Sequence, residues 1–426
     1  MKQETLCIHG GYTPDNDTHS CTVPVYRSTA FTFNNTEHAA NLFALRELGN
    51  IYSRLTNPTT GVMEKRLALL EGAHELGGLG HASGTAAIFN SIINVASAGD
   101  NIVSAQNLYG GTYTQFASIL PAMGIEVRFV DSRDPDNFAK AIDGKTRALF
   151  CETISNPALD ITDLAAVADV AKAHGLPLMV DSTCTTPYLS RPIEHGADVV
   201  IHSLTKWLGG HGAGLGGIAI DAGKFDWKGG KHPLFDEPDA SYHGLRWGHD
   251  LPEPLAPLAF ILRMRTVPLR NLGACIGPDN SWQIMQGVET LPLRMERHCE
   301  NALAVAKHLK EHAKVEWVRF PGLEDDPEFA NNQKYLDGKG GAVVVFGIKG
   351  GAAAGSEFIN ALKMFSHVAN LGDAKSLAIH PATTTHSQLS AEQQAAGGIP
   401  PELVRLSVGI EHIDDILADL DQALGA

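Results

Sequence analysis

Short apolar runs typical of buried strands alternate with helical stretches through residues 57–280 of this 426-residue chain, and this alternation limits its possible folds most. Strands that alternate with helices usually form a largely parallel sheet covered by helices. The clearest strand-like runs are 101–104, 147–150, 176–180 and 197–203, and the clearest helical stretches are 63–70, 83–98 and 164–174. We therefore expect an α/β fold with a mostly parallel central sheet.

Each strand-like run leads to a polar residue suited to one organic cofactor. In chain order these residues are Tyr109, Asn156, Asp181 and Lys206. Ligands of open α/β sheets bind at the carboxyl ends of the strands, so the four side chains should meet at one edge. An aldehyde cofactor needs an amine to bond to, a carboxylate to keep its pyridine nitrogen protonated and a ring to stack against. Lys206, Asp181 and Tyr109 therefore predict a site for pyridoxal phosphate.

Each of these signals has an ordinary structural explanation when it stands alone. Asp181 could cap a turn, Lys206 could be a surface lysine, and the small residues of 81–87 could simply begin a helix. A helix start is also a favourable site for a phosphate, and the hydroxyls of Ser203 and Thr205 flank Lys206. Only the conjunction of these features, and no single one of them, predicts the cofactor.

Two other ligand classes are not expected. The glycines of 212–217 match a dinucleotide-binding pattern, but they precede a strand-like run instead of following one. Pairs such as His202 with His211, or His380 with His386, lack a recognised metal-ligand spacing, so we predict no metal site.

Composition narrows the class of partner and the compartment. The net charge of −15 argues against nucleic acid and anionic membranes as partners, because both require clustered Lys and Arg. The six cysteines show neither metal-type spacing nor the density of a disulfide scaffold. No run approaches the roughly 20 apolar residues that a membrane span needs. We expect a protein of the cytoplasm.

The length of the chain predicts more than one domain. Residues 1–56 lack a sustained period and are expected to form an extended arm that lies on another surface. Residues 57–283 should bind the cofactor and include an irregular insertion over 222–278. Residues 284–426 should form a smaller α+β domain, with a helix over 293–312, a strand over 341–347 and a helix over 352–364.

Seven segments resemble a known family, the pyridoxal phosphate enzymes of cysteine and methionine metabolism. They are YSRLTNPT at 52–59, SGT at 83–85, LYGGT at 108–112, ET at 152–153 with NP at 156–157, VDST at 180–183, SLTK at 203–206 and VRLSVGIE at 404–411. Together they span nearly the whole chain. The resemblance implies the aspartate-aminotransferase-like (type I) fold, with helices on both faces of the sheet.

The resemblance also implies a role for each residue. Lys206 would bond to the cofactor and move protons, Asp181 would hold the pyridinium proton, and Tyr109 would stack on the ring. Asn156 would donate to the cofactor's phenolic oxygen. The expected phosphate ligands are Ser83, Gly84, Thr85, Ser203 and Thr205, together with Tyr52 and Arg54 from a neighbouring subunit. Arg405 would bind the substrate α-carboxylate, with Asn370 and Tyr52 as further substrate contacts. A homo-oligomer, as a dimer of dimers, is expected.

Within this family, three segments favour members that replace the acetate of O-acetyl-L-homoserine by sulfide. These segments are EPDASYHG at 237–244, NLGDAKS at 370–376 and HPATTTH at 380–386. The alternatives are methionine γ-lyase, a cystathionine γ-synthase or lyase activity, and use of the succinyl ester. The γ-lyases carry a cysteine where this chain has Gly111, which weakens that alternative. Partners are therefore expected to be small molecules, a homoserine ester and sulfide or a thiol.

Overall fold

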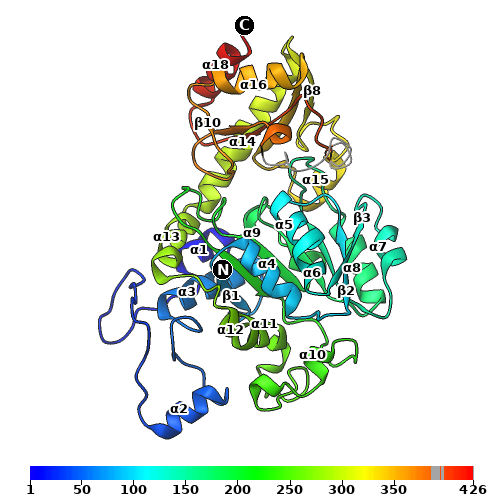
Figure 1. Ribbon diagram of the computed structural model, residues 1–426. Helices are drawn as coiled ribbons and strands as arrows, with labels where there is room; N and C mark the ends of the chain where they lie inside the picture. Colours follow the sequence, from blue (N-terminus) through cyan, green and yellow to red (C-terminus); the bar gives the residue numbers. More distant parts are fainter. Residues whose placement is uncertain (385–393, 395–397, 426) are drawn as a thin grey trace.

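Two β-sheets organise the molecule, and each has its own buried core (Figure 1). The computed structural model describes residues 1–384, 394 and 398–425. In Figure 1 the smaller sheet and its helices lie above the larger sheet. The division near residue 283 stays a prediction; that residue lies within the helix Pro278–Glu289, and the helix Leu291–Glu311 then leads to the smaller sheet.

The larger sheet has seven strands in the order β1-β7-β6-β5-β4-β2-β3. Their bounds are β1 Gly78–His81, β2 Asn101–Ala105, β3 Glu126–Val130, β4 Thr146–Glu152, β5 Leu178–Asp181, β6 Val199–Ser203 and β7 Gly217–Asp221. The neighbours from β6 to β3 pair in parallel, whereas β7 is antiparallel to both β6 and β1. The sheet is thus mixed and mostly parallel, as the sequence predicted.

Helices cover this sheet, and local sequence signals explain where the main ones begin. Helix α3 Pro58–Glu71 precedes β1, and the helices between the strands are α4 Gly84–Ile93, α5 Gly110–Thr114, α6 Leu120–Ala122, α7 Asp136–Ala141, α8 Leu164–Ala173 and α9 Thr186–Leu189. The Asn57 side chain accepts from the N–H groups of Thr59 and Thr60 at the start of α3, and Ser83 accepts from Ala86 at the start of α4. These caps fix where the two helices begin, and the start of α4 lies against Ser203 at the end of β6.

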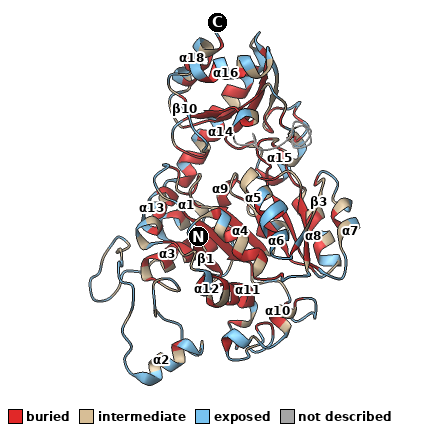
Figure 2. Ribbon diagram, in the orientation of Figure 1, coloured by how far each residue is buried: buried red, intermediate tan, exposed pale blue. Residues whose placement is uncertain are grey.

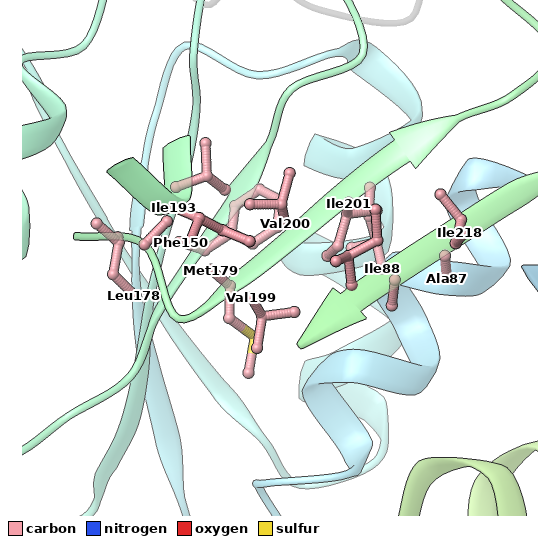
Figure 3. Close-up of a cluster of buried hydrophobic side chains, with 14 of the residues drawn as sticks. Ala87, Ile88, Phe150, Leu178, Met179, Ile193, Val199, Val200, Ile201 and Ile218 are labelled. Carbon is pink, nitrogen blue, oxygen red and sulfur yellow. The ribbon is translucent and has the colours of Figure 1, made fainter. Parts of the chain in front are cut away.

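The core of the larger unit lies between the central strands and the helices that cover them. Figure 3 shows Val199, Val200 and Ile201 of β6 beside side chains of β4, β5, β7 and α4. The three residues are fully buried, and each such side chain stabilises the fold by about 1.5–3 kcal/mol. Because both faces of β6 are buried, Lys206 follows a strand that is held firmly in place.

The smaller sheet contains β10 Ser366–His367, β11 Leu377–Ile379, β12 Leu403–Ser407, β9 Val343–Ile348 and β8 Val315–Arg319, in that spatial order. All neighbours pair antiparallel except β10 and β11. The helices of this region are α13 Pro278–Glu289, α14 Leu291–Glu311, α15 Phe329–Tyr335, α16 Gly351–Ala361 and α18 Ile413–Leu424. The predicted strand and both predicted helices are therefore present, within a few residues of their expected bounds.

The N-terminal arm differs in part from the expected extended segment. Helix α1 (Gln3–His9) packs on α3 and α13 and buries Cys7, so the first residues belong to the body. In the next part, α2 (Thr36–Phe43) lies away from the body at the end of long irregular segments (Figure 1), and its contact with a neighbouring subunit stays a prediction. Figure 2 shows that this part is largely exposed.

The segment 222–278 is only partly irregular, which corrects the prediction. Before Ala259, helix α10 (Pro233–Asp236) and 3-10 turns at Ala240–Tyr242 and Ala256–Leu258 interrupt otherwise irregular chain. From Ala259 to Leu272 the chain is helical throughout, as α11 (Ala259–Met264), a π-helical turn and α12 (Arg270–Leu272). The sequence did not reveal this helix because all residues of α11 are buried, so its apolar residues show no one-sided pattern, and because Pro268 interrupts the run.

None of the helices in the described part of the chain is long and apolar enough to cross a membrane. Of the segment 380–386, Thr385 and His386 lie outside the described residues.

Candidate active site

A cavity of about 590 Å³ lies at the carboxyl ends of β4, β5 and β6, where these strands face the smaller sheet. It collects eleven of the thirteen residues predicted for the site. They are Ser83, Gly84, Thr85, Tyr109, Asn156, Asp181, Ser203, Thr205, Lys206, Asn370 and Arg405. The four strand ends that the sequence singled out thus meet in one cavity.

Tyr52 and Arg54 lie elsewhere, on the exposed arm. The Tyr52 side chain is 41% exposed, and the guanidinium of Arg54 lies 5.0 Å from the centre of its ring. These two residues do not line the cavity of their own chain, and their role toward a neighbouring subunit stays a prediction.

One end of the cavity is formed by the start of α4 and the end of β6. A Cβ atom on Gly84 would lie 2.7 Å from the Cβ of Ser203, so only glycine permits this close approach. The exposed Thr85 stands in the first turn of α4, where free N–H groups and the helix dipole favour an anion. The Thr205 hydroxyl is already engaged, since it accepts from the N–H of Gly216 at 3.2 Å.

The carboxylate of Asp181 is held in one orientation by Thr183. Its Oδ1 accepts from the Thr183 N–H at 3.0 Å and from the Thr183 hydroxyl at 2.5 Å. Burial raises the pKa of Asp181, while these two hydrogen bonds lower it. A protonated pyridine nitrogen beside this carboxylate would further favour its charged form.

The Lys206 amine is half-buried and points toward the smaller sheet. Its Nζ donates to Oδ1 of Asn370 at 2.6 Å. Burial, and next the charge of Arg405, lower the pKa of Lys206. A lowered pKa increases the fraction of neutral amine, which is the form that attacks an aldehyde or accepts a proton.

Arg405 comes from β12 of the smaller sheet and is almost fully buried. Its Nη1 donates to Oδ1 of Asn156 at 3.1 Å, and its Nη2 donates to the Asn370 carbonyl at 3.0 Å. Within the described residues no carboxylate pairs with it, and its Nε has no hydrogen-bond partner. Burial lowers the pKa of Arg405 to about 10, which leaves it charged at neutral pH. A buried guanidinium without a counter-ion suits the carboxylate of an incoming amino acid.

Tyr109 stands at the start of α5 with half of its surface exposed to the cavity and solvent. Its N–H donates to Oε1 of Glu152 at 2.7 Å. A Cβ atom on Gly111 would lie 2.6 Å from the Tyr109 ring, so this glycine leaves room for the ring.

Several residues that line the cavity received no role from the sequence, although Glu152 and Thr183 stand in segments that carry the family resemblance. They include Gln115, Glu152, Thr183, Cys184 and Leu215. Glu152 could have been found, because it is the acidic residue that directly follows the apolar run ending at Cys151, as Asp181 follows the run ending at Val180. Gln115 begins a π-helical turn, for which no simple sequence pattern exists.

The residues present fit pyridoxal phosphate. The fit rests on the glycine-permitted contact between α4 and β6, on the half-buried Lys206 and on an oriented carboxylate at Asp181. The unpaired Arg405 adds a place for a substrate carboxylate on the opposite side, next to Asn370.

Comparison with known proteins supports this assignment. The family model described as Cys/Met metabolism PLP-dependent enzyme matches residues 4–425. The chain is 54% identical to an O-acetyl-L-homoserine sulfhydrylase of Leptospira meyeri, covering 100% of this chain and 97% of that protein. It is 52% identical to O-acetyl-L-homoserine sulfhydrylase 1 of Thermus thermophilus, with 100% of both chains covered.

A solved structure agrees with both the fold and the cofactor. A putative O-acetylhomoserine (thiol)-lyase of Campylobacter jejuni superposes with a TM-score of 0.95 at 41% identity, covering 100% of both chains. That crystal structure contains N'-pyridoxyl-lysine-5'-monophosphate, a lysine joined covalently to the cofactor. The chain described above belongs to the pyridoxal phosphate-dependent enzymes of cysteine and methionine metabolism.

Proposed function

We propose that this protein is an O-acetyl-L-homoserine sulfhydrylase. It converts O-acetyl-L-homoserine and sulfide into L-homocysteine and acetate, so the Cγ–O bond of the ester breaks and a Cγ–S bond forms. The observation that carries the proposal is the similarity, over the whole chain, to relatives with this name. The product is a precursor in methionine biosynthesis.

Lys206 is the proposed base and proton carrier. Pyridoxal phosphate, when bound, supplies a conjugated ring that accepts electrons from the substrate's α-carbon. Lys206 stands at the end of β6 with a pKa lowered by burial, so its amine can take a proton from that carbon and return it. The Asn370 amide oxygen, 2.6 Å away, accepts a hydrogen bond from the amine and holds it next to the smaller sheet.

Three further residues are proposed to orient the cofactor ring. Asp181, oriented by Thr183, would hold the proton of the pyridine nitrogen. Tyr109 would stack on one face of the ring, and Asn156 would donate from its amide nitrogen, because its oxygen accepts from Arg405.

The phosphate is proposed to bind at the start of α4. Ser83, Gly84, Thr85, Ser203 and Thr205 surround this end of the cavity. Tyr52 and Arg54 of a second subunit would complete it, which requires at least a dimer; we propose a dimer of dimers. The exposed arm that carries these two residues supports this part of the proposal.

Arg405 is the proposed anchor of the substrate α-carboxylate, with Asn370 and Tyr52 as neighbouring contacts. Both Nη atoms of Arg405 donate to neutral oxygens in the structure. A carboxylate is a stronger acceptor than either and can engage the guanidinium with two oxygens.

Gly111 favours replacement over γ-elimination as the main reaction. A side chain at this position would meet the ring of Tyr109, with the added Cβ only 2.6 Å from the Tyr109 Cε1. The cysteine typical of the γ-lyases would therefore shift Tyr109, and the cavity of this protein would change shape.

The experiment that tests the proposal is product analysis with purified, cofactor-loaded protein. O-acetyl- and O-succinyl-L-homoserine are each supplied with and without sulfide or methanethiol, and homocysteine, its S-methyl product and 2-oxobutyrate are measured. We expect homocysteine as the main product from the acetyl ester and sulfide. If 2-oxobutyrate forms equally fast at saturating sulfide, the protein is a γ-lyase and the proposal is wrong.

We also propose a cytoplasmic location and the three-part division at residues 56 and 283. All six cysteines are free thiols, which suits a reducing compartment.

A further inference from the structure

Glu152 is an acidic residue of the cofactor cavity that the proposed reaction does not use. It ends β4, is only 6% exposed, and lies in register with Asp181 at the end of β5. Its Oε1 accepts the N–H of Tyr109 at 2.7 Å. The site therefore holds two carboxyl groups side by side, away from bulk water.

The two carboxyl groups differ in their hydrogen-bond donors. Asp181 accepts two hydrogen bonds from Thr183, one of them from a hydroxyl. Glu152 accepts one, from the Tyr109 backbone. Since hydrogen bonds to the charged form favour ionisation, the negative charge of the pair belongs on Asp181.

The cations of the cavity do not neutralise Glu152. The Nζ of Lys206 bonds to Asn370, and Arg405 donates to Asn156 and Asn370. No salt bridge to Glu152 forms within the described residues. The other titratable groups near it, Cys151 and Cys184, are thiols whose pKa is raised by burial, so they stay neutral. An ionised Glu152 would thus be a buried carboxylate without a cation and beside another carboxylate, which is strongly unfavourable.

We propose that Glu152 is a positioning residue that stays a neutral carboxylic acid: it anchors the backbone of Tyr109 and leaves Asp181 as the one negatively charged member of this carboxyl pair. Burial, and next the charge of Asp181, raise the pKa of Glu152 well above its usual range, which agrees with this assignment. The inference rests on the proposed roles of Asp181 and Tyr109 and not on the identity of the ester or thiol.

The variant Glu152→Gln tests the charge. Glutamine is neutral, has nearly the same shape and keeps an oxygen that can accept from Tyr109. The visible absorbance of the resting, cofactor-loaded protein is titrated against pH for the wild type and for Glu152→Gln. Asp181→Asn, which removes the carboxylate assigned the negative charge, is the control for loss of a charge. We expect the wild-type profile within about 0.3 pH units for Glu152→Gln and a clear change for Asp181→Asn. A shift of one pH unit or more to lower pH in Glu152→Gln would overturn the proposal, because it would reveal the loss of a negative charge.

The variant Glu152→Ala tests the anchor. It leaves the Tyr109 N–H without its acceptor, and we expect cofactor affinity, measured by equilibrium dialysis, to weaken about five- to tenfold. Unchanged affinity in Glu152→Ala would contradict the anchoring role. Circular dichroism of both variants reports whether they fold, and Glu152→Gln decides the charge even if Glu152→Ala does not fold.

Infrared difference spectra provide a readout that does not depend on turnover. The spectrum of cofactor-loaded wild type minus Glu152→Gln, in water and in deuterium oxide near pH 7.5, should show a protonated-carboxyl band that shifts on deuteration. Carboxylate bands in that difference would refute the neutral acid. Because none of these measurements uses substrate, a failure of the proposed sulfhydrylase activity would leave their outcome unaffected.

Discussion

The amine of Lys206 donates to the amide oxygen of Asn370 at 2.6 Å, although 164 positions separate the two residues in the chain. Lys206 follows β6 of the larger sheet, whereas Asn370 lies between β10 and β11 of the smaller one. This contact joins the two halves of the molecule at the cavity. It also identifies where the lysine can rest when it is not bonded to the cofactor.

Replacing Lys206 by alanine should abolish covalent attachment of the cofactor. Among the described residues that line the cavity, Lys206 is the only lysine, so no other amine of the cavity can take its place. We expect loss of the visible absorbance of the lysine-bound cofactor and of nearly all turnover. Absorbance spectra and borohydride reduction followed by peptide mass analysis check this. A labelled lysine elsewhere in the chain would contradict the assignment.

Asp181→Asn should bind the cofactor but react slowly. The amide is neutral and cannot stabilise a protonated pyridine nitrogen, for which a nearby opposite charge is worth about 1–3 pKa units. We expect kcat to fall roughly tenfold to a thousandfold, with folding preserved. Steady-state kinetics of the variant, compared with Asp198→Asn at the opposite end of the sheet as a control, test the effect. A normal rate would mean that another group holds this proton.

Arg405→Lys should weaken binding of the amino acid substrate. Lysine keeps the charge but loses the planar fork that can bond both carboxylate oxygens. The loss of about one charge-assisted hydrogen bond, worth about 1.5–3 kcal/mol, predicts a decrease in kcat/KM of roughly tenfold to a hundredfold. Kinetics with the acetyl ester at fixed sulfide measure it. An unchanged kcat/KM would exclude Arg405 from carboxylate binding.

Mixed oligomers should reveal a site shared between subunits. Arg54 lies on the exposed arm and outside the cavity of its own chain. Chains with Arg54→Ala and chains with Lys206→Ala are each expected to be inactive. When they are unfolded, mixed and refolded together, some sites receive both native residues and activity should return in part. No recovery, despite mixed oligomers detected by differential tags, would count against a shared site.

Mild acid should destabilise the fold through buried His298. Its Nδ1 bonds to the Val408 carbonyl, its Nε2 has no partner among the described residues, and burial lowers its pKa to about 4. The unfolded chain takes up a proton near pH 6.5 but the folded chain does not, so stability falls as pH falls from about 6.5 toward 4.

His298→Gln isolates this effect. Between pH 7.5 and 5.5 the wild type should lose about 1 kcal/mol more of its free energy of unfolding than this variant does. Urea unfolding at the two pH values measures the difference, with the exposed His9→Gln as a control. Equal pH dependence in the wild type and His298→Gln would show that His298 does not contribute.

Much of the fold and part of the site could be predicted from local sequence. Apolar runs of four to seven residues are buried on both faces in this structure, as the strands of a covered parallel sheet must be. Because parallel strands end at a common edge, Asn156, Asp181 and Lys206 could be assigned to one site from their positions after such runs.

Other features depend on contacts between distant segments, for which short-range periodicity carries no signal. The sequence alone did not place Asn370 against Lys206, or Arg405 against Asn156, 249 positions away. It also missed the packing of α1 on the body and the helix over 259–272, because the residues that bury these helices come from remote elements. Local sequence therefore determined the strands, the cofactor lysine and its carboxylate. Only the tertiary structure, through the packing of the smaller sheet on the strand ends, decided which groups surround the amine. The pairing of β4 with β5 in the larger sheet placed Glu152 beside Asp181.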